Sequence, residues 1–143
     1  MTRIAALLLG FTLLMASPVD LSAQAADATS RTFAAPIDRV WPVTESVLKS
    51  LGWDIDKSDR AVGWILTDSR GVEFKDYGVY GKGPRHKLRL SLKAVGEGWT
   101  SVSVERELYT EERILWMTER KPLAKTDASV EIAVLDAIQK GLP

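Results

Sequence analysis

The chain contains no cysteine among its 143 residues and only one histidine, His86. The lack of cysteine excludes a disulfide framework, a thiolate metal site and a lipid-modified N-terminal cysteine. The single histidine excludes a metal site built from several histidines of one chain. Any serine–histidine catalytic group would need His86, whose neighbours Arg85, Lys87 and Arg89 are typical of a polar strand edge. We therefore expect no catalytic residues, no metal site, no cofactor and no enzymatic activity.

Net charge is also missing, because 19 basic residues balance 19 acidic ones. A balanced charge argues against nucleic acid, or an anionic membrane surface, as a partner bound by bulk electrostatics. Beyond the N-terminal segment, no apolar stretch approaches the roughly 20 residues of a membrane-spanning helix. We therefore expect no nucleic-acid partner and no integral membrane span once that segment is removed. The sequence indicates no particular oligomeric state.

The start of the chain has the pattern of a secretory signal peptide. Arg3 supplies a positive charge, residues 4–15 are apolar, and residues 23–25 form a small-x-small cleavage site. The apolar run is too short to cross a hydrocarbon core of roughly 30 Å. We therefore expect cleavage near Ala26 and a periplasmic mature protein without a lipid anchor, with retention of the segment as an uncleaved anchor as the alternative.

The predicted domain organisation follows from this processing. Residues 1–25 are the signal peptide, residues 26–30 a disordered leader, and residues 31–143 a single domain. A domain of this length has enough chain to bury a real core without disulfides.

Two amphipathic helices are predicted, one near each end of the domain. Residues 37–51 repeat apolar side chains at helical spacing, with Asp38 as a candidate N-cap and Gly52 as the residue that ends the helix. A second helix begins after Thr126 or Asp127 and ends at Gly141. Its apolar stripe consists of Val130, Ala133, Val134, Ala137 and Ile138.

Alternating apolar and polar residues predict two antiparallel hairpins. In the first, residues 53–57 pair with residues 62–67 across a turn at residues 58–60. In the second, residues 87–94 and 100–107 pair around a three-residue turn at 96–98, a register that satisfies both faces. This register places four pairs opposite each other: Leu92 and Val102, Leu90 and Val104, Arg89 and Glu105, Lys87 and Glu107. The charged pairs indicate a solvated face rather than a binding patch.

The fold class is therefore α+β, with an antiparallel sheet of about four to six strands packed against an N-proximal and a C-terminal helix. Residues 111–121 fit a short strand or a helical turn, and we favour a strand because the run is short and Pro122 follows. Residues 114–117 are expected to be buried. Of the five tryptophans, the pattern predicts that Trp99 is exposed and that the other four are core residues: Trp41, Trp53, Trp64 and Trp116.

A glycine-rich segment, residues 70–85, is long for a hairpin connection. Aromatic and basic side chains on a loop are typical of binding surfaces. The candidate binding residues are Phe74, Tyr77, Tyr80, Lys82 and Arg85. The alternative is that these rings fold back over the sheet or extend the first hairpin.

The order of motifs in residues 33–41, 47–53 and 59–67 resembles the BamC (NlpB) outer-membrane lipoprotein family. That resemblance implies a helix-grip fold and a role in envelope protein assembly through protein contacts rather than catalysis. The chain departs from the family in lacking the lipidated cysteine and in having one domain. The opening Ala34-x-Pro36-x-x-x-Val40-Trp41 also resembles the START-like ligand-binding domains.

Two functional hypotheses follow. The first is a non-enzymatic periplasmic protein-interaction module with an envelope protein as its partner, serving envelope or outer-membrane assembly. The second is a START-like carrier of a small hydrophobic ligand, which requires an enclosed cavity of a few hundred Å³ between the sheet and the helices.

Overall fold

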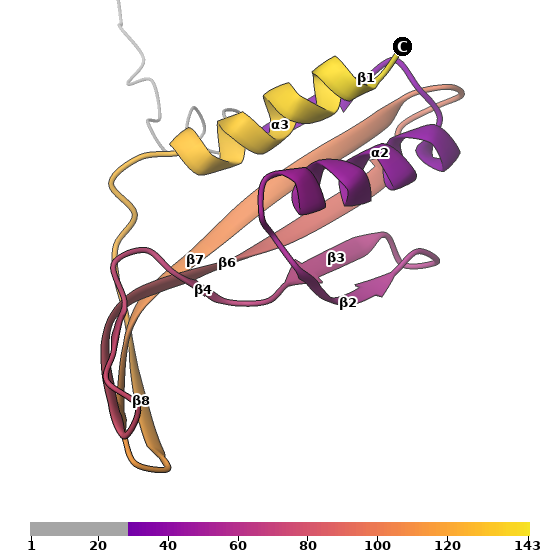
Figure 1. Ribbon diagram of the computed structural model, residues 1–143. Coiled ribbons are helices and arrows are strands. Elements are labelled where there is room, and N and C mark those ends of the chain that lie inside the picture. The colour runs from indigo at the N-terminus through magenta and orange to yellow at the C-terminus, as the bar shows by residue number, and fades with distance from the viewer. Residues whose placement is uncertain (1–28) are drawn as a thin grey trace, which may run out of the picture.

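The computed structural model describes residues 29–143 and shows an α+β fold in which two helices cover one face of an antiparallel sheet (Figure 1). The signal peptide and most of the leader lie outside the described residues, and Ser30 already belongs to the first strand. The elements are β1 (Ser30–Phe33), α2 (Ile37–Ser50), β2 (Ile55–Asp59), β3 (Trp64–Thr67), β4 (Arg70–Gly71), β5 (Lys75–Asp76), β6 (Tyr80–Ala94), β7 (Thr100–Ile114), β8 (Met117–Pro122) and α3 (Ser129–Gly141).

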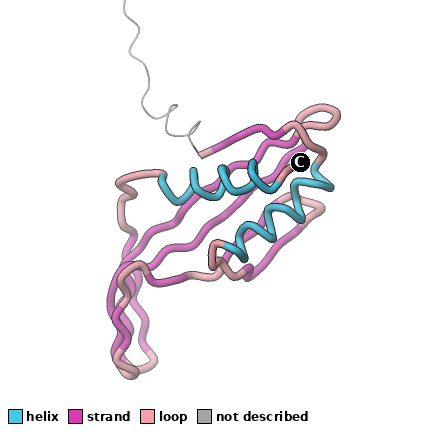
Figure 2. Tube along the Cα trace, turned by 45° about the horizontal axis from the view of Figure 1, so that its top comes forward, coloured by secondary structure: helices cyan, strands magenta, loops and turns pink. Residues whose placement is uncertain are grey.

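The hairpin of β6 and β7 is the spine of the sheet. In the part of the hairpin near the β6–β7 turn, β7 pairs with β1 and β6 pairs with β3, which in turn pairs with β2; this part lies under the helices. In the part far from that turn, β6 pairs with the short strands β4 and β5, and β7 pairs with β8. This far part of the sheet, residues 72–85 and 109–122, projects away from both helices in two views (Figures 1 and 2). We call it the arm, and the helix-covered part the body.

The predicted register of the central hairpin is confirmed. Leu92 lies opposite Val102, Leu90 opposite Val104 and Lys87 opposite Glu107. Lys87 Nζ lies 3.1 Å from Glu107 Oε2 on the solvent face. The apolar members of the pairs form the core with side chains from both helices. The alternation of apolar and polar residues therefore predicts correctly which face of the sheet packs against the helices.

The helix α2 ends as its sequence predicts. Gly52 has φ +81, which a residue with a Cβ adopts only at a cost. The Trp53 N–H donates to the Leu48 carbonyl at 2.8 Å, and the Gly52 N–H donates to the Lys49 carbonyl at 3.0 Å. These two bonds are the Schellman arrangement, which turns the chain back and buries Trp53 in the core.

Both helix starts differ from the prediction. Pro36 is the N-cap of α2, so Asp38 lies in the first turn, where its charge favours the positive end of the helix dipole. Ala128 is the N-cap of α3, and Asp127 instead accepts the Ser129 N–H at 3.0 Å. The predicted apolar stripe of α3 also omitted Leu135 and Glu131, and both are fully buried.

The sheet is larger than expected, with eight strands rather than four to six. The turn of the first hairpin begins later than predicted and occupies residues 60–63, because the Asp59 carboxylate accepts the Val62 N–H at 3.0 Å and the Asp59 carbonyl accepts the Gly63 N–H at 2.7 Å. Gly63 has φ +91, and a Cβ there would lie 2.3 Å from the Leu92 carbonyl oxygen. Glycine is therefore required where this turn meets β6.

Candidate interaction site

Residues 70–85, expected to be a loop, are mostly paired strand. They contain β4, β5 and the first residues of β6, which lies against β7 along its whole length. This matches the alternative that the segment extends the sheet. The high glycine content of the segment favoured a loop. In the structure, Gly81 and Gly83 instead make room for a side chain that lies across the strand.

That side chain is Phe74, which is half-buried on the glycine face of β6. A Cβ at Gly81 would lie 2.7 Å from Phe74 Cζ, and a Cβ at Gly83 would lie 2.9 Å from Phe74 Cα. The Arg85 guanidinium lies 4.9 Å from the centre of the Phe74 ring. Phe74 and Arg85 therefore both have a structural role in the arm, whatever they contribute to binding.

A polar network continues from Arg85 across the arm. Arg85 Nε donates to Ser69 Oγ at 2.9 Å, and the Tyr109 hydroxyl donates to the same oxygen at 2.7 Å. Arg120 Nε donates to Glu111 Oε2 at 2.8 Å, and this bond raises the pKa of Arg120 above its ordinary value. The network joins β8, β7 and β6 to the segment before β4, so the arm has a defined shape.

Tyr77, Tyr80 and Lys82 lie nearer the end of the arm. Lys82 Nζ lies 3.5 Å from Glu112 Oε2, and the Tyr80 hydroxyl donates to Glu112 Oε1 at 3.2 Å. The Tyr77 ring stacks on Tyr80 with centroids 6.3 Å apart and is 66% exposed. Tyr77 is thus the most exposed aromatic residue of the predicted site.

The end of the arm is apolar. Ile114 pairs with Met117, so β7 and β8 are joined by a two-residue turn of Leu115 and Trp116. Trp116 is 86% exposed, and its three apolar neighbours in the turn are exposed as well. The turn of residues 77–79 lies beside it, because the Leu115 N–H donates to the Val79 carbonyl at 2.6 Å. We call this group the apolar cap: Tyr77, Val79, Ile114, Leu115, Trp116 and Met117.

The prediction that residues 114–117 and Trp116 are buried is wrong. Residues 111–121 are strand, as favoured, but they comprise the ends of β7 and β8 with a turn between them; these ends run past the edge of the helical layer, so no element of residues 29–143 covers them (Figure 1). The sequence carried a signal for this, because charged residues flank the short apolar run on both sides, at 111–113 and 119–121. Trp64 is half-buried, and Trp99 is 49% exposed as predicted.

Leu115 has an unusual backbone conformation, with φ +56. A positive φ at the first residue of a two-residue hairpin turn is the pattern of a type II′ turn, a position that favours glycine. An L-residue with a side chain pays roughly 1–2 kcal/mol to adopt this region. The chain therefore presents a large apolar side chain where a glycine would cost less.

The charges below the apolar cap are paired. Arg113 Nη2 donates to Asp76 Oδ1 at 2.6 Å, and the Gly78 N–H donates to the same oxygen at 2.9 Å. The Gly78 bond and then the Arg113 bond lower the pKa of Asp76. Lys121 Nζ lies 3.4 Å from Glu119 Oε1. With Lys82 and Glu112 these residues form the charged collar at the base of the cap: Asp76, Lys82, Glu112, Arg113, Glu119 and Lys121. Its three positive and three negative charges balance.

His86 is a core residue, only 5% exposed, and does not lie on a polar edge. Its ring lies 4.7 Å from the Trp53 ring, and Arg70 Nε donates to its Nε2 at 3.3 Å. Burial lowers the pKa of His86 to about 4, with further lowering by Arg70 and Arg106 and a smaller opposing effect of Glu131. The imidazole is therefore neutral near pH 7, and its packing is that of a structural residue.

A buried ion cluster lies beside His86, under the first turn of α3. Glu131 is fully buried, with Arg106 Nε 3.5 Å from its Oε2 and Lys125 Nζ 3.5 Å from its Oε1. Arg106 lies opposite Leu88, at the end of the apolar core. The cluster ties α3 to β7 by charge, beyond the point where apolar contacts end.

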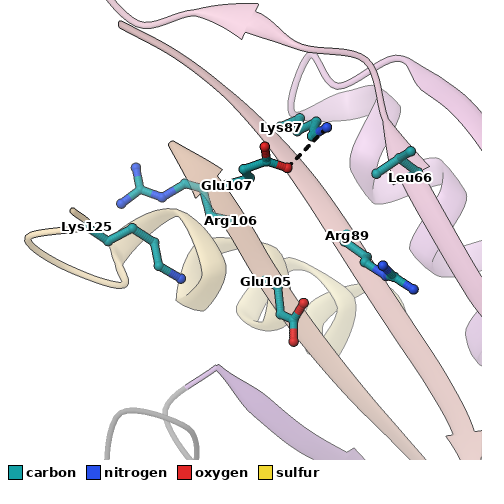
Figure 3. Close-up of a pocket in the computed structure, with 7 residues that line it drawn as sticks. All are labelled: Leu66, Lys87, Arg89, Glu105, Arg106, Glu107 and Lys125. Atoms are coloured by element: carbon teal, nitrogen blue, oxygen red, sulfur yellow. Dashed lines mark ion pairs between the residues drawn. The ribbon is translucent and has the colours of Figure 1, made fainter. Parts of the chain in front are cut away.

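A cleft of about 590 Å³ opens on the solvent face of the central hairpin (Figure 3). Its lining includes Lys87, Arg89, Glu105 and Glu107, which are the residues predicted to form a solvated charged face. Lys87 and Glu107 are paired across it, as the dashed line shows. The mixed, paired charges point to no particular ligand.

Within residues 29–143, no three histidine, cysteine or acidic side chains are grouped so that they could hold a metal ion. The same part of the chain has no helix long and apolar enough to cross a membrane. No protein-family model matches this chain, and no curated protein matches it. The resemblance to the BamC family therefore stays a prediction.

Proposed function

We propose that this chain is a non-enzymatic interaction module of the periplasm that docks on another component of the cell envelope through its apolar cap. The observation that carries this proposal is the gathering of six exposed apolar side chains at one projecting end of the molecule. Single exposed apolar residues are ordinary on protein surfaces, but contiguous groups of them mark interaction sites.

The shape of the arm supports docking. His86 is the core residue of β6 that lies nearest the arm. From there to Tyr80, at the base of the cap, the strand covers roughly 20 Å at 3.3 Å per residue. The polar network around Glu111 and the packing of Phe74 restrain the arm. A rigid projection loses little conformational entropy on binding, which favours affinity.

The local backbone supports it as well. The turn of Leu115 and Trp116 keeps a strained φ in order to present two large side chains to solvent. Strain of this kind persists where the residue is needed for something other than stability.

The signal-peptide pattern and the BamC-like segments, residues 33–67, favour the envelope, and outer-membrane assembly in particular, as the place and process. The envelope protein that the sequence analysis expects as the partner is one such component of the envelope. The START-like alternative gains no support, because Leu88, Leu90, Val102 and Val104 are fully buried in a packed core, and the cleft in Figure 3 is lined mainly by charged residues.

The test compares two tryptophan variants at opposite ends of the same hairpin. Trp116→Ser removes the centre of the apolar cap, and Trp99→Ser removes an exposed tryptophan beside the β6–β7 turn. Association of each purified protein with the isolated cell envelope is measured by co-sedimentation. We expect Trp116→Ser to lose association and Trp99→Ser to keep it. Equal association of the two variants would refute docking through the cap.

A further inference from the structure

We infer that the envelope component met by the apolar cap is the lipid bilayer itself, into whose interfacial region the cap inserts while the charged collar stays at the level of the headgroups. This inference rests on the proposed function and names its partner. Four features of the cap support this inference: its position at a projecting end, its depth, the hydrogen bonds of its backbone, and its composition and charge.

The apolar side chains of the cap come from two adjacent turns. Ile114 and Met117 form one cross-strand pair, Leu115 and Trp116 form the turn beyond them, and Val79 comes from the adjacent turn. All of these side chains are exposed at the end of the arm. A groove on a protein contacts a hairpin from chosen sides, whereas acyl chains surround an inserted end completely. Exposed apolar side chains from two turns at a projecting end fit the second environment.

The depth of the cap fits the interface of a bilayer. Going back from the turn at Leu115 and Trp116, the first charged or polar residues are Arg113 on β7 and Thr118 on β8. The apolar part is therefore about 7 Å deep, two residue positions at 3.3 Å per residue. Interfacial segments bury their apolar faces about 5–10 Å into the boundary between headgroups and acyl chains.

Three backbone N–H groups of the two turns have partners within the protein, which favours insertion because lipid offers none. The Leu115 N–H donates to the Val79 carbonyl at 2.6 Å, and the Tyr77 N–H donates to the Tyr80 carbonyl at 2.7 Å. The Gly78 N–H donates to the Asp76 carboxylate. The first of these bonds joins the two turns, and the other two lie within residues 76–80.

Composition and charge complete the match. Tryptophan and tyrosine favour the membrane–water interface, where one end of the ring is apolar and the other is wet, and Trp116 and Tyr77 provide them. The collar residues Arg113 and Asp76 pair with each other, as do Lys82 and Glu112. Since the whole chain also has no net charge, insertion should need neither anionic lipid nor low salt.

The experiment uses residues 26–143, because all residues of the described core lie between Phe33 and Leu142 and the N-terminal apolar segment would itself bind lipid. Co-sedimentation with phosphatidylcholine vesicles is compared with vesicles that also contain phosphatidylglycerol, at low and high salt. We expect partitioning into both, little changed by salt. A variant with serine at positions 115, 116 and 117 should partition at least about tenfold less, with Trp99→Ser unchanged.

Fluorescence gives a second readout. Trp116 emission should shift to shorter wavelength on addition of vesicles and be quenched by lipids brominated near the headgroup end of the acyl chain, and Trp116→Phe should abolish both changes. Quenching only by lipids brominated deep in the chain, or none at all, would contradict interfacial insertion.

The failures are distinguishable. If the cap variants lose association with the whole envelope but the unaltered protein does not bind vesicles, the bilayer is the wrong partner and an envelope protein takes its place, while the proposed function stands. If binding needs phosphatidylglycerol and vanishes with salt, charge drives it and the inference is overturned. A cap-dependent dimer that binds no vesicles would assign the cap to a second copy.

Discussion

Replacing Leu115 by glycine separates the strain of the arm's turn from its role in docking. In the structure Leu115 has φ +56 and is 52% exposed. Glycine relieves roughly 1–2 kcal/mol of strain. It costs about 0.5–1 kcal/mol in the entropy of the unfolded chain, and about 1 kcal/mol more from the half-buried part of the leucine side chain. The free energy of unfolding should therefore change by less than about 1 kcal/mol.

Serine at the same position provides the matched control. Leu115→Ser loses the same apolar contact but keeps an L-residue at positive φ, so it should be less stable than Leu115→Gly by about 0.5–1 kcal/mol. Denaturant unfolding measures this difference, and co-sedimentation with the cell envelope measures docking. Both variants should dock more weakly than the unaltered protein despite their different stabilities.

Two results would refute this reasoning. Leu115→Gly protein that docks as well as the unaltered chain would show that the leucine side chain is not part of the contact. A glycine variant less stable than the serine variant by about 0.5–1 kcal/mol, the entropy cost of glycine alone, would show that the turn stores no strain, which removes the backbone argument for the cap.

Three further predictions concern the body and the base of the arm. Because the pKa of His86 is lowered in the folded protein, the unfolded chain takes up the proton first as pH falls. The contribution of His86 to the free energy of unfolding is therefore full above about pH 6.5 and should decrease by about 2 kcal/mol between pH 7 and 5. Denaturant unfolding of His86→Leu should show a stability that depends less steeply on pH, and an equally steep pH dependence would contradict a buried neutral imidazole. Phe74→Ala should cost about 2 kcal/mol, since the ring is half-buried, whereas Tyr77→Ser should cost under about 0.5 kcal/mol; similar thermal shifts for the two would contradict their division into structural and exposed residues. Glu131→Ala should cost about 3 kcal/mol or more because it leaves Arg106 largely buried without its closest carboxylate, and a neutral result in the same assay would show that the cluster adds nothing.

The body could be predicted from the sequence because its local signals agree with one another. Leu88, Leu90 and Leu92 alternate with polar residues, and a slip of one position would expose them, so one register remains. Gly52 ends α2 through a motif that needs only local hydrogen bonds. Fold class, helix positions and the central hairpin followed from these signals.

The arm could not be predicted in the same way, because its buried side depends on residues distant in sequence. Gly81 and Gly83 read as turn residues until Phe74 is seen to occupy the space above them. The buried face of β7 also changes along the strand: Val104 faces the helices, whereas Tyr109 is buried on the face that meets Ser69. No single period describes such a strand.

The apolar cap was misjudged for a related reason. An apolar run such as residues 114–117 is equally compatible with burial and with an exposed hairpin end. What decides between them is whether another layer lies above, and that depends on where α2 and α3 stop.

Photocrosslinking inside living cells tests docking through the cap most directly. A photoreactive amino acid is placed at position 116, in the exposed turn of the arm, or at position 99, at the other end of the hairpin, and the adducts are identified by mass. We predict envelope adducts from position 116, with the mass of a phospholipid among them, and few or none from position 99. Equal yields from the two positions, or no adduct from position 116, would contradict docking through the apolar cap.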